Sequence, residues 1–235
     1  MSLLLRNAFW TLCLFILVGC ATHGLPRWRN FQGDLPGQGY LSVESGFAVS
    51  SAWRSSPYSI TTSSPVIGVD SDGREVIYFG TVDGELVALN SEDGNERWRR
   101  SFATDSKSTA IISTPAISTD GSIYVITNQR YEDGLIRSVL HKVDEFSRIR
   151  WSYTISDDGF TSGAPKVLVW GQDTLVFIYV TLFVDENPQG ALLVLRDRGK
   201  AVELLDRESL GTCQWGSTEL QVRREDVVNT LTALW

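Results

Sequence analysis

The chain has 235 residues and a formal net charge of −7, with 43% apolar and 21% charged residues. This length suits one or two domains with a sizeable core. The acidic balance excludes non-specific nucleic-acid binding and a basic membrane-surface patch, because both need a cluster of Lys and Arg. Eight Trp, seven Tyr and ten Phe beside a single Met favour β structure.

The N-terminal segment differs in character from the rest of the chain. Arg6 precedes the apolar run AFWTLCLFILV over residues 8–18, which is shorter than a membrane span and typical of a signal peptide. The run leads to Gly19-Cys20, which resembles a bacterial lipobox, in which the cysteine thiol takes a diacylglyceryl group. We expect a signal peptide over residues 1–19 and a lipid anchor on Cys20. An ordinary signal peptide or an N-terminal membrane anchor are the alternatives.

The other cysteines form no recognisable framework. Cys13 lies in the segment expected to be removed, which leaves Cys213 as a free thiol without an assigned role, so no disulfide set or zinc pattern is expected. Ala21 follows the lipobox cysteine, and in the lipoprotein pattern this residue favours the outer membrane. We expect an outer-membrane lipoprotein facing the periplasm, with residues 20–45 as a tether and lead-in.

The rest of the chain is a repeat. Pro65, Pro115 and Pro165 are about fifty residues apart, and each precedes a short apolar run. Each unit contains four runs of β-branched and aromatic residues, separated by Asp-Gly or other glycine-containing turns that need a positive φ. The expected units cover residues 60–105, 110–155 and 160–208, with a degenerate remainder over 209–235.

In the third unit, the sequence NPQG at residues 187–190 is predicted to form a turn. The preceding pair Asp185-Glu186 is expected to be a solvated loop tip or a loop that contacts a partner.

Tryptophan marks the fourth run of the units. Trp98 and Trp151 occupy the same place, and Trp53 occupies it for a preceding unit. An aromatic residue that repeats at one strand position is expected to pack between neighbouring units as core. Four strands in a period of about fifty residues are typical of a β-propeller. We therefore expect an all-β fold: a propeller of four-stranded blades over residues 46–235. Material for about four blades leaves the ring incomplete, so further blades or a second chain would be needed to close it.

The first unit points to a family. Its sequence SSPVI…DGREVIYFGTVDGELVALNSEDGNERWRRSF resembles the repeat of the pyrroloquinoline-quinone-like (PQQ-like) propellers, and WRNFQGD at residues 28–34 is similar to the stretch that precedes their first blade. The resemblance covers residues 28–205 and weakens from the first unit to the third. It implies the propeller fold expected above.

No group of residues suggests catalysis. In quinoprotein alcohol dehydrogenases, which share the repeat, the resemblance implies a stacked Trp, a vicinal Cys-Cys disulfide and a bound calcium ion; this chain has no Cys-Cys pair, so no cofactor is expected. Residues 70–73 and 157–159 are fragments of a calcium loop that lack its full set of ligands, so no metal is expected. His23 lies beside the lipid anchor, and His141 lacks a triad partner and is expected to be a surface or cross-strand residue.

These features predict a non-enzymatic protein. A lipobox followed by these repeats resembles the family of lipoprotein scaffolds in the outer-membrane β-barrel assembly machinery, which implies a periplasmic scaffold that binds an envelope protein. The alternatives are a fragment or relative of a PQQ-dependent quinoprotein dehydrogenase, and a truncated product without function.

Overall fold

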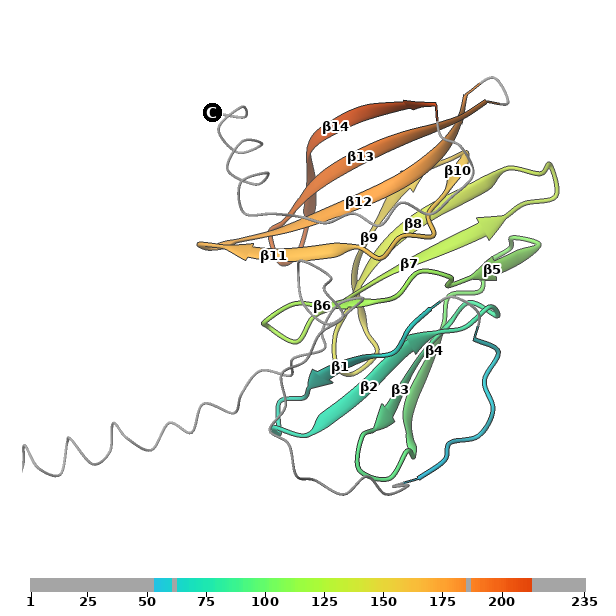
Figure 1. Cartoon of the computed structure of the whole chain (residues 1–235). Helices are drawn as coiled ribbons and strands as arrows, with labels where there is room; N and C mark the ends of the chain where they lie inside the picture. The colour runs from blue at the N-terminus through green and yellow to red at the C-terminus, as the bar shows by residue number, and fades with distance from the viewer. Residues whose placement is uncertain (1–52, 61–62, 185–186, 213–235) are drawn as a thin grey trace, which may run out of the picture.

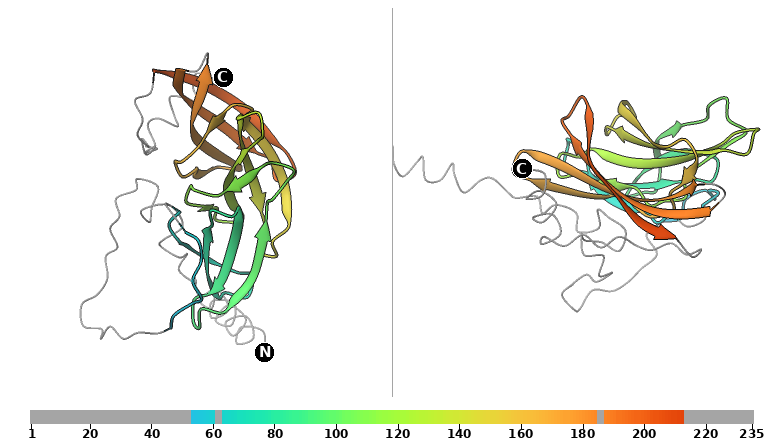
Figure 2. Two further views of the ribbon diagram at one scale, coloured as in Figure 1. Left: turned by 90° about the vertical axis from the view of Figure 1, so that its right-hand side faces the viewer. Right: turned by 90° about the horizontal axis from the view of Figure 1, so that it is seen from above.

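The computed structural model describes residues 53–60, 63–184 and 187–212, and its regular structure consists of strands (Figure 1). The strands form three antiparallel sheets in chain order, which lie side by side along a curved row (Figure 2). We call these sheets the first, second and third blade. The expected signal peptide and tether lie outside the described residues, as do Cys20, Cys213 and the pair Asp185-Glu186.

Each blade has four strand positions, as the sequence predicts. The first blade contains β1 (Val66–Val69), β2 (Glu75–Gly80), β3 (Glu85–Asn90) and β4 (Glu96–Ser101). The second contains β5 (Ser108–Ala110), β6 (Ala116–Ile117), β7 (Ile123–Arg130), β8 (Ile136–Val143) and β9 (Ile149–Ser156). The third contains β10 (Gly159–Phe160), β11 (Lys166–Trp170), β12 (Asp173–Val184), β13 (Asn187–Asp197) and β14 (Val202–Thr212). The first position is split in the last two blades, because β5 and β6 both pair with β7, and β10 and β11 both pair with β12.

The prediction of a turn at residues 187–190 is wrong. These residues begin β13, where Asn187 pairs with Val184 and Pro188 pairs with Phe183. The strand β12 extends to Val184 and offers a backbone partner to each of them, so pairing between strands overrides the local turn preference of Asn, Pro and Gly.

The prolines that mark the repeat hold equivalent places in the three blades, and the tryptophans hold equivalent places before the first blade, in β4 and in β9. Pro65, Pro115 and Pro165 directly precede β1, β6 and β11, where a residue without a backbone N–H fits the start of a strand. Each tryptophan indole N–H donates a hydrogen bond to the blade that follows it in the chain. The acceptors are the carbonyl oxygen of Ser91 for Trp53 (2.7 Å), that of Glu145 for Trp98 (2.7 Å), and Asp197 Oδ1 for Trp151 (3.1 Å).

Alternate residues along each strand point to opposite faces of the blade, and both faces of each blade carry apolar side chains. In the first blade, Tyr78 faces the second blade, whereas its neighbour Phe79 packs with Trp53 and Tyr58 on the opposite face. The first seam, between the first and second blades, is a core cluster that includes Val76, Tyr78, Leu86, Ala88, Ile123 and Val125. The second seam, between the second and third blades, includes Tyr124, Ile126, Leu140, Trp151, Val176, Ile178, Leu193 and Leu195.

Five described connections share one hydrogen-bonded turn, in which the first residue's N–H bonds to the fifth residue's carbonyl and the fourth residue's N–H bonds to the first residue's carbonyl. They span residues 70–74, 81–85, 118–122, 131–135 and 144–148. The fourth residue always has a positive φ, and it is glycine in four turns but Ser147, with φ of 65°, in the fifth. A residue with a Cβ is disfavoured in this conformation.

Ser147→Gly is therefore expected to raise the free energy of unfolding by about 1 kcal/mol, because glycine removes the steric cost of the left-handed conformation. Urea denaturation measures this difference. The matched control is Gly134→Ser, where φ is 90° and an added Cβ would have no atom within 4 Å, so backbone strain is the main cost. An unchanged or lower stability of Ser147→Gly would contradict the prediction.

Candidate functional site

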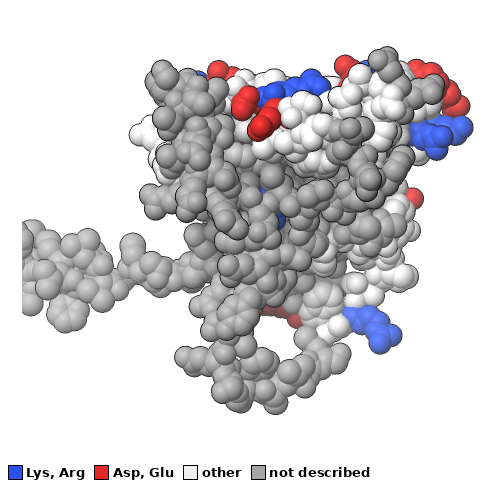
Figure 3. All heavy atoms as spheres, turned by 45° about the horizontal axis from the view of Figure 1, so that its top comes forward, with Lys and Arg blue, Asp and Glu red and all other residues white. Residues whose placement is uncertain are grey.

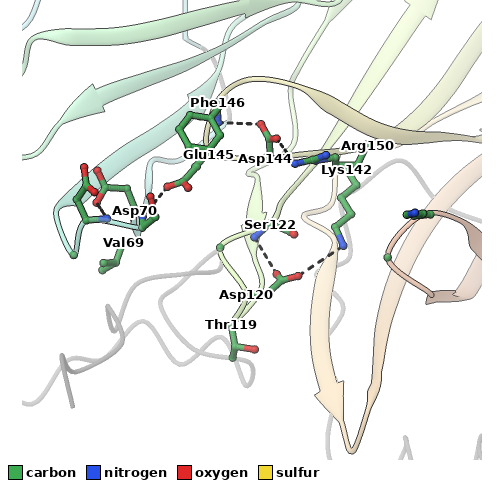
Figure 4. A pocket seen from close by; sticks show the side chains of 16 residues that line it. Val69, Asp70, Thr119, Asp120, Ser122, Lys142, Asp144, Glu145, Phe146 and Arg150 are labelled. Carbon is green, nitrogen blue, oxygen red and sulfur yellow. Dashed lines mark hydrogen bonds and ion pairs between the residues drawn. The ribbon is translucent and has the colours of Figure 1, made fainter. Parts of the chain in front are cut away.

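The turns at one end of the blades surround a groove with a volume of about 850 Å³ (Figure 4). In an antiparallel sheet, the connection between the first two strand positions and the connection between the last two lie at the same end, so these turns come together. The groove is lined by residues 70–73, 119–122 and 144–146, by Gly199 and Lys200, and by Val69, Lys142 and Arg150. We call this site the turn groove.

An ion pair at the second seam borders the turn groove. Lys142 Nζ lies 2.6 Å from Asp197 Oδ2 and 3.8 Å from Asp120 Oδ2. The carboxylate of Asp197 is fully buried and also accepts hydrogen bonds from the Tyr124 hydroxyl at 2.5 Å and from the Gly199 amide at 2.7 Å. Burial raises the pKa of Asp197, but the bonds from Lys142 and Tyr124 outweigh it, so the pKa lies below its usual value. The carboxylate therefore stays charged and fixes Lys142 beside the groove.

The first blade contributes the turn at Asp70. Its carboxylate accepts bonds from the amides of Asp72 and Arg74, and from the guanidinium groups of Arg74 at 3.1 Å and Arg97 at 2.6 Å. Burial raises the pKa of Asp70, but these bonds lower it below its usual value. Both oxygens are thus used within the protein, so the turn is built as a hairpin turn rather than as a calcium loop.

Glu145 links the first and second blades at the groove. Its carboxylate Oε2 accepts a bond of 2.7 Å from the Ser71 amide, and its carbonyl accepts the bond from Trp98. Figure 4 shows the Glu145 side chain pointing from its own turn towards the turn of the first blade. The groove is therefore built across the first seam on turns that hydrogen bonds hold together.

The groove presents positively and negatively charged side chains and one exposed aromatic ring. Phe146 is 61% exposed, and the Arg148 guanidinium lies 5.1 Å from its ring centroid. Asp144 pairs with Arg148 at 2.8 Å and with Arg150 at 2.7 Å. On the described surface visible in Figure 3, acidic and basic side chains are likewise interspersed. A mixed surface with an aromatic anchor suits contact with a protein better than binding of a polyanion.

The predicted tryptophans do not lie in the groove. Trp151 is buried in the second seam, Trp98 packs against the first, and both indole N–H groups are bonded to the next blade. The Trp151 ring, which is 8% exposed, therefore offers no accessible face on which a quinone could stack. Among the described residues, no group of three or more His, Cys, Asp and Glu side chains could hold a metal ion, and Asp157 pairs with Arg137 at 2.9 Å.

His141 is a buried cross-strand residue. Its Nε2 lies 3.0 Å from the Thr127 hydroxyl and its Nδ1 lies 2.8 Å from the Ser152 hydroxyl. Burial, together with the positive charge of Arg100, lowers the pKa of His141 to about 4. The neutral ring therefore packs between the strands of the second blade. The sequence left a surface position and a cross-strand position open for His141, and the structure has the cross-strand one.

Sequence reasoning missed the turn groove. The turn at Phe146-Ser147 is visible in the sequence, and an aromatic residue in a turn is a signal for a contact site. The role of Lys142 and Asp197 has no such signal, because 55 residues separate them and the packing of two blades brings them together.

Among the residues that the structure describes, none forms a helix with the length and hydropathy of a membrane span. Solved structures with a similar fold include the quinohemoprotein alcohol dehydrogenase from Comamonas testosteroni, with a TM-score of 0.51 and 11% identity over 84% of this chain and 43% of that chain. BamB from Moraxella catarrhalis has a TM-score of 0.29 and 13% identity over 70% of this chain and 54% of that chain. This chain thus spans about half the length of each of these proteins. At 11% identity, the likeness to the dehydrogenase shows the fold alone.

No curated protein matches the sequence. The family model described as outer membrane protein assembly factor BamB matches residues 48–197. This match covers all three described blades except the end of the third, and it includes more than half of the chain. The chain therefore belongs to the PQQ-like repeat family of the outer membrane protein assembly factor BamB.

Proposed function

We propose that this protein is a non-enzymatic, membrane-anchored lipoprotein that acts in the periplasm as a protein-binding scaffold in outer-membrane protein assembly. The observation that carries the proposal is the turn groove, in which hydrogen-bonded turns present an exposed Phe146 among paired charges. Membership of the BamB family supports a partner in outer-membrane assembly. The lipobox-like Gly19-Cys20 supports the anchor and the periplasmic location.

The way in which the groove would bind follows from its construction. The blades are fixed to one another by apolar seams, so the turns lose little conformational freedom when a partner docks. Phe146 supplies apolar area that a partner pocket can bury, and the ion pairs of Asp144 at the rim favour a partner with interspersed charges. The quinoprotein alternative gains no support from the dehydrogenase fold, because a fold can serve many functions.

Photo-crosslinking in intact cells tests the proposal. With a photoreactive amino acid at position 146, we expect a crosslink to a component of the outer-membrane assembly machinery. The matched control is position 135, because Leu135 is also an exposed apolar residue, 43% exposed, but lies in the turn between β7 and β8 at the opposite end of the blade.

Phe146→Ala is expected to weaken binding of the crosslinked partner about 30-fold, the effect of removing a central aromatic anchor from an interface. Leu135→Ala is expected to leave the affinity within about twofold. Binding of the purified full chain to that partner, measured by calorimetry, checks both values. Equal crosslinking from both positions, or an affinity that Phe146→Ala does not change, would contradict the placement of the contact.

A further inference from the structure

The ring of His141 lies inside the first seam. It packs against Phe102, which follows β4 of the first blade, with the two ring centroids 4.5 Å apart. The histidine is 6% exposed, and both of its ring nitrogens are within hydrogen-bond distance of hydroxyl groups on β7 and β9. From β8, the imidazole therefore contacts β7 and β9 of the second blade and the segment that follows β4 of the first blade.

The surroundings of this ring oppose a positive charge. Neither Thr127 nor Ser152, its two polar neighbours, is a carboxylate that could neutralise an imidazolium. On the described elements packed against the ring, the charged group that acts on it is Arg100 of β4, whose Nε is buried without a hydrogen-bond partner among the described residues. Other charged side chains of these strands are held in ion pairs: Glu96, Arg97, Arg99, Arg137, Lys142 and Arg150. Arg130 is exposed at the end of β7.

We infer that the first seam is acid-sensitive: protonation of His141 places a second positive charge beside Arg100 within the seam and favours its opening. In the closed seam the ring is shielded from water, whereas in an opened seam water can reach and solvate the imidazolium. The bonds from Trp98 and Ser71 to Glu145 cross the same seam at the turn groove. Opening would therefore also separate the two sides of the groove. The inference goes beyond the proposed function and stands whether or not a partner docks there.

The direction and range of the effect follow from the two protonation equilibria. The pKa of His141 is about 4 in the closed seam and 6.5 when the ring is exposed to water. Stability of the seam is thus fully present above pH 6.5 and is lost as the pH falls towards 4. Between pH 7.5 and pH 5 the equilibrium constant for opening is expected to rise about 30-fold.

The test is a pH titration of the full chain by NMR. We expect the His141 imidazole to titrate below about pH 5, and the protection of the Trp98 indole N–H against exchange to fall about 30-fold between pH 7.5 and pH 5, after correction for the intrinsic rate. His23 is distinguished by the variant His23→Gln. Titration of His141 at its ordinary value, with unchanged protection of Trp98, would overturn the inference without the need for a variant in the seam.

Two variants separate the charge from the packing. His141→Gln keeps a polar side chain that cannot be protonated, so its Trp98 protection is expected to stay within about twofold over the same pH range. Arg100→Met removes the nearby cation, so the loss of protection on acidification is expected to be smaller than in the wild type. A His141→Gln protein that loses protection in parallel with the wild type would show that another group governs the seam.

Discussion

Asp197→Leu is expected to lower the free energy of unfolding by about 3–5 kcal/mol, the cost of leaving a buried charge without its partner. The substitution removes the acceptor that lies 2.6 Å from Lys142 Nζ, and Lys142 is only 7% exposed. It also leaves the Tyr124 hydroxyl and the Trp151 indole N–H at the second seam without this acceptor. Urea denaturation, followed by circular dichroism, measures the change.

The same hairpin provides a matched control. Arg198 and Glu203 form an ion pair at 3.0 Å, but both side chains are about half exposed, so Glu203→Gln is expected to cost less than about 1 kcal/mol. The loss of stability in Lys142→Met should lie between those of Asp197→Leu and Glu203→Gln, because Asp197 keeps its other hydrogen-bond donors. An Asp197→Leu protein as stable as the wild type would show that the buried network contributes nothing to joining the blades.

Trp151→Ala is the second substitution with a large expected effect. It should lower the free energy of unfolding by about 3–5 kcal/mol, because removing the indole leaves a cavity in the second seam. Trp151 is 8% exposed, and its ring centroid lies 5.9 Å from that of Tyr124. Thermal unfolding by calorimetry measures the effect. Trp151→Phe keeps an aromatic ring and loses the bond to Asp197, so it should cost less.

Phe146→Ala is the contrasting substitution for this prediction, because the same kind of truncation at a 61% exposed ring should change stability by no more than about 0.5 kcal/mol. The same stability measurement would also establish that Phe146→Ala, the variant used in the binding experiment, is folded. Equal losses for Trp151→Ala and Phe146→Ala would contradict the assignment of Trp151 to the core between blades.

The repeat made the blades predictable. The equal spacing of Pro65, Pro115 and Pro165 and the Asp-Gly turns between apolar runs define strands and turns over short distances in the chain, where sequence patterns are informative. The turn expected at residues 187–190 failed for the opposite reason: its conformation depends on pairing with β12, which a local pattern does not contain.

The sequence by itself determined the all-β class, the four strand positions of each blade and the family, because all of these depend on a sequence repeat of about fifty residues. It also indicated that tryptophan recurs at one strand position. Only the tertiary structure decided which groups meet across the seams: Lys142 with Asp197, Trp98 with Glu145, and His141 with Phe102. These contacts depend on how successive sheets pack face to face, because that packing brings together side chains that lie far apart in the chain and that no local pattern relates.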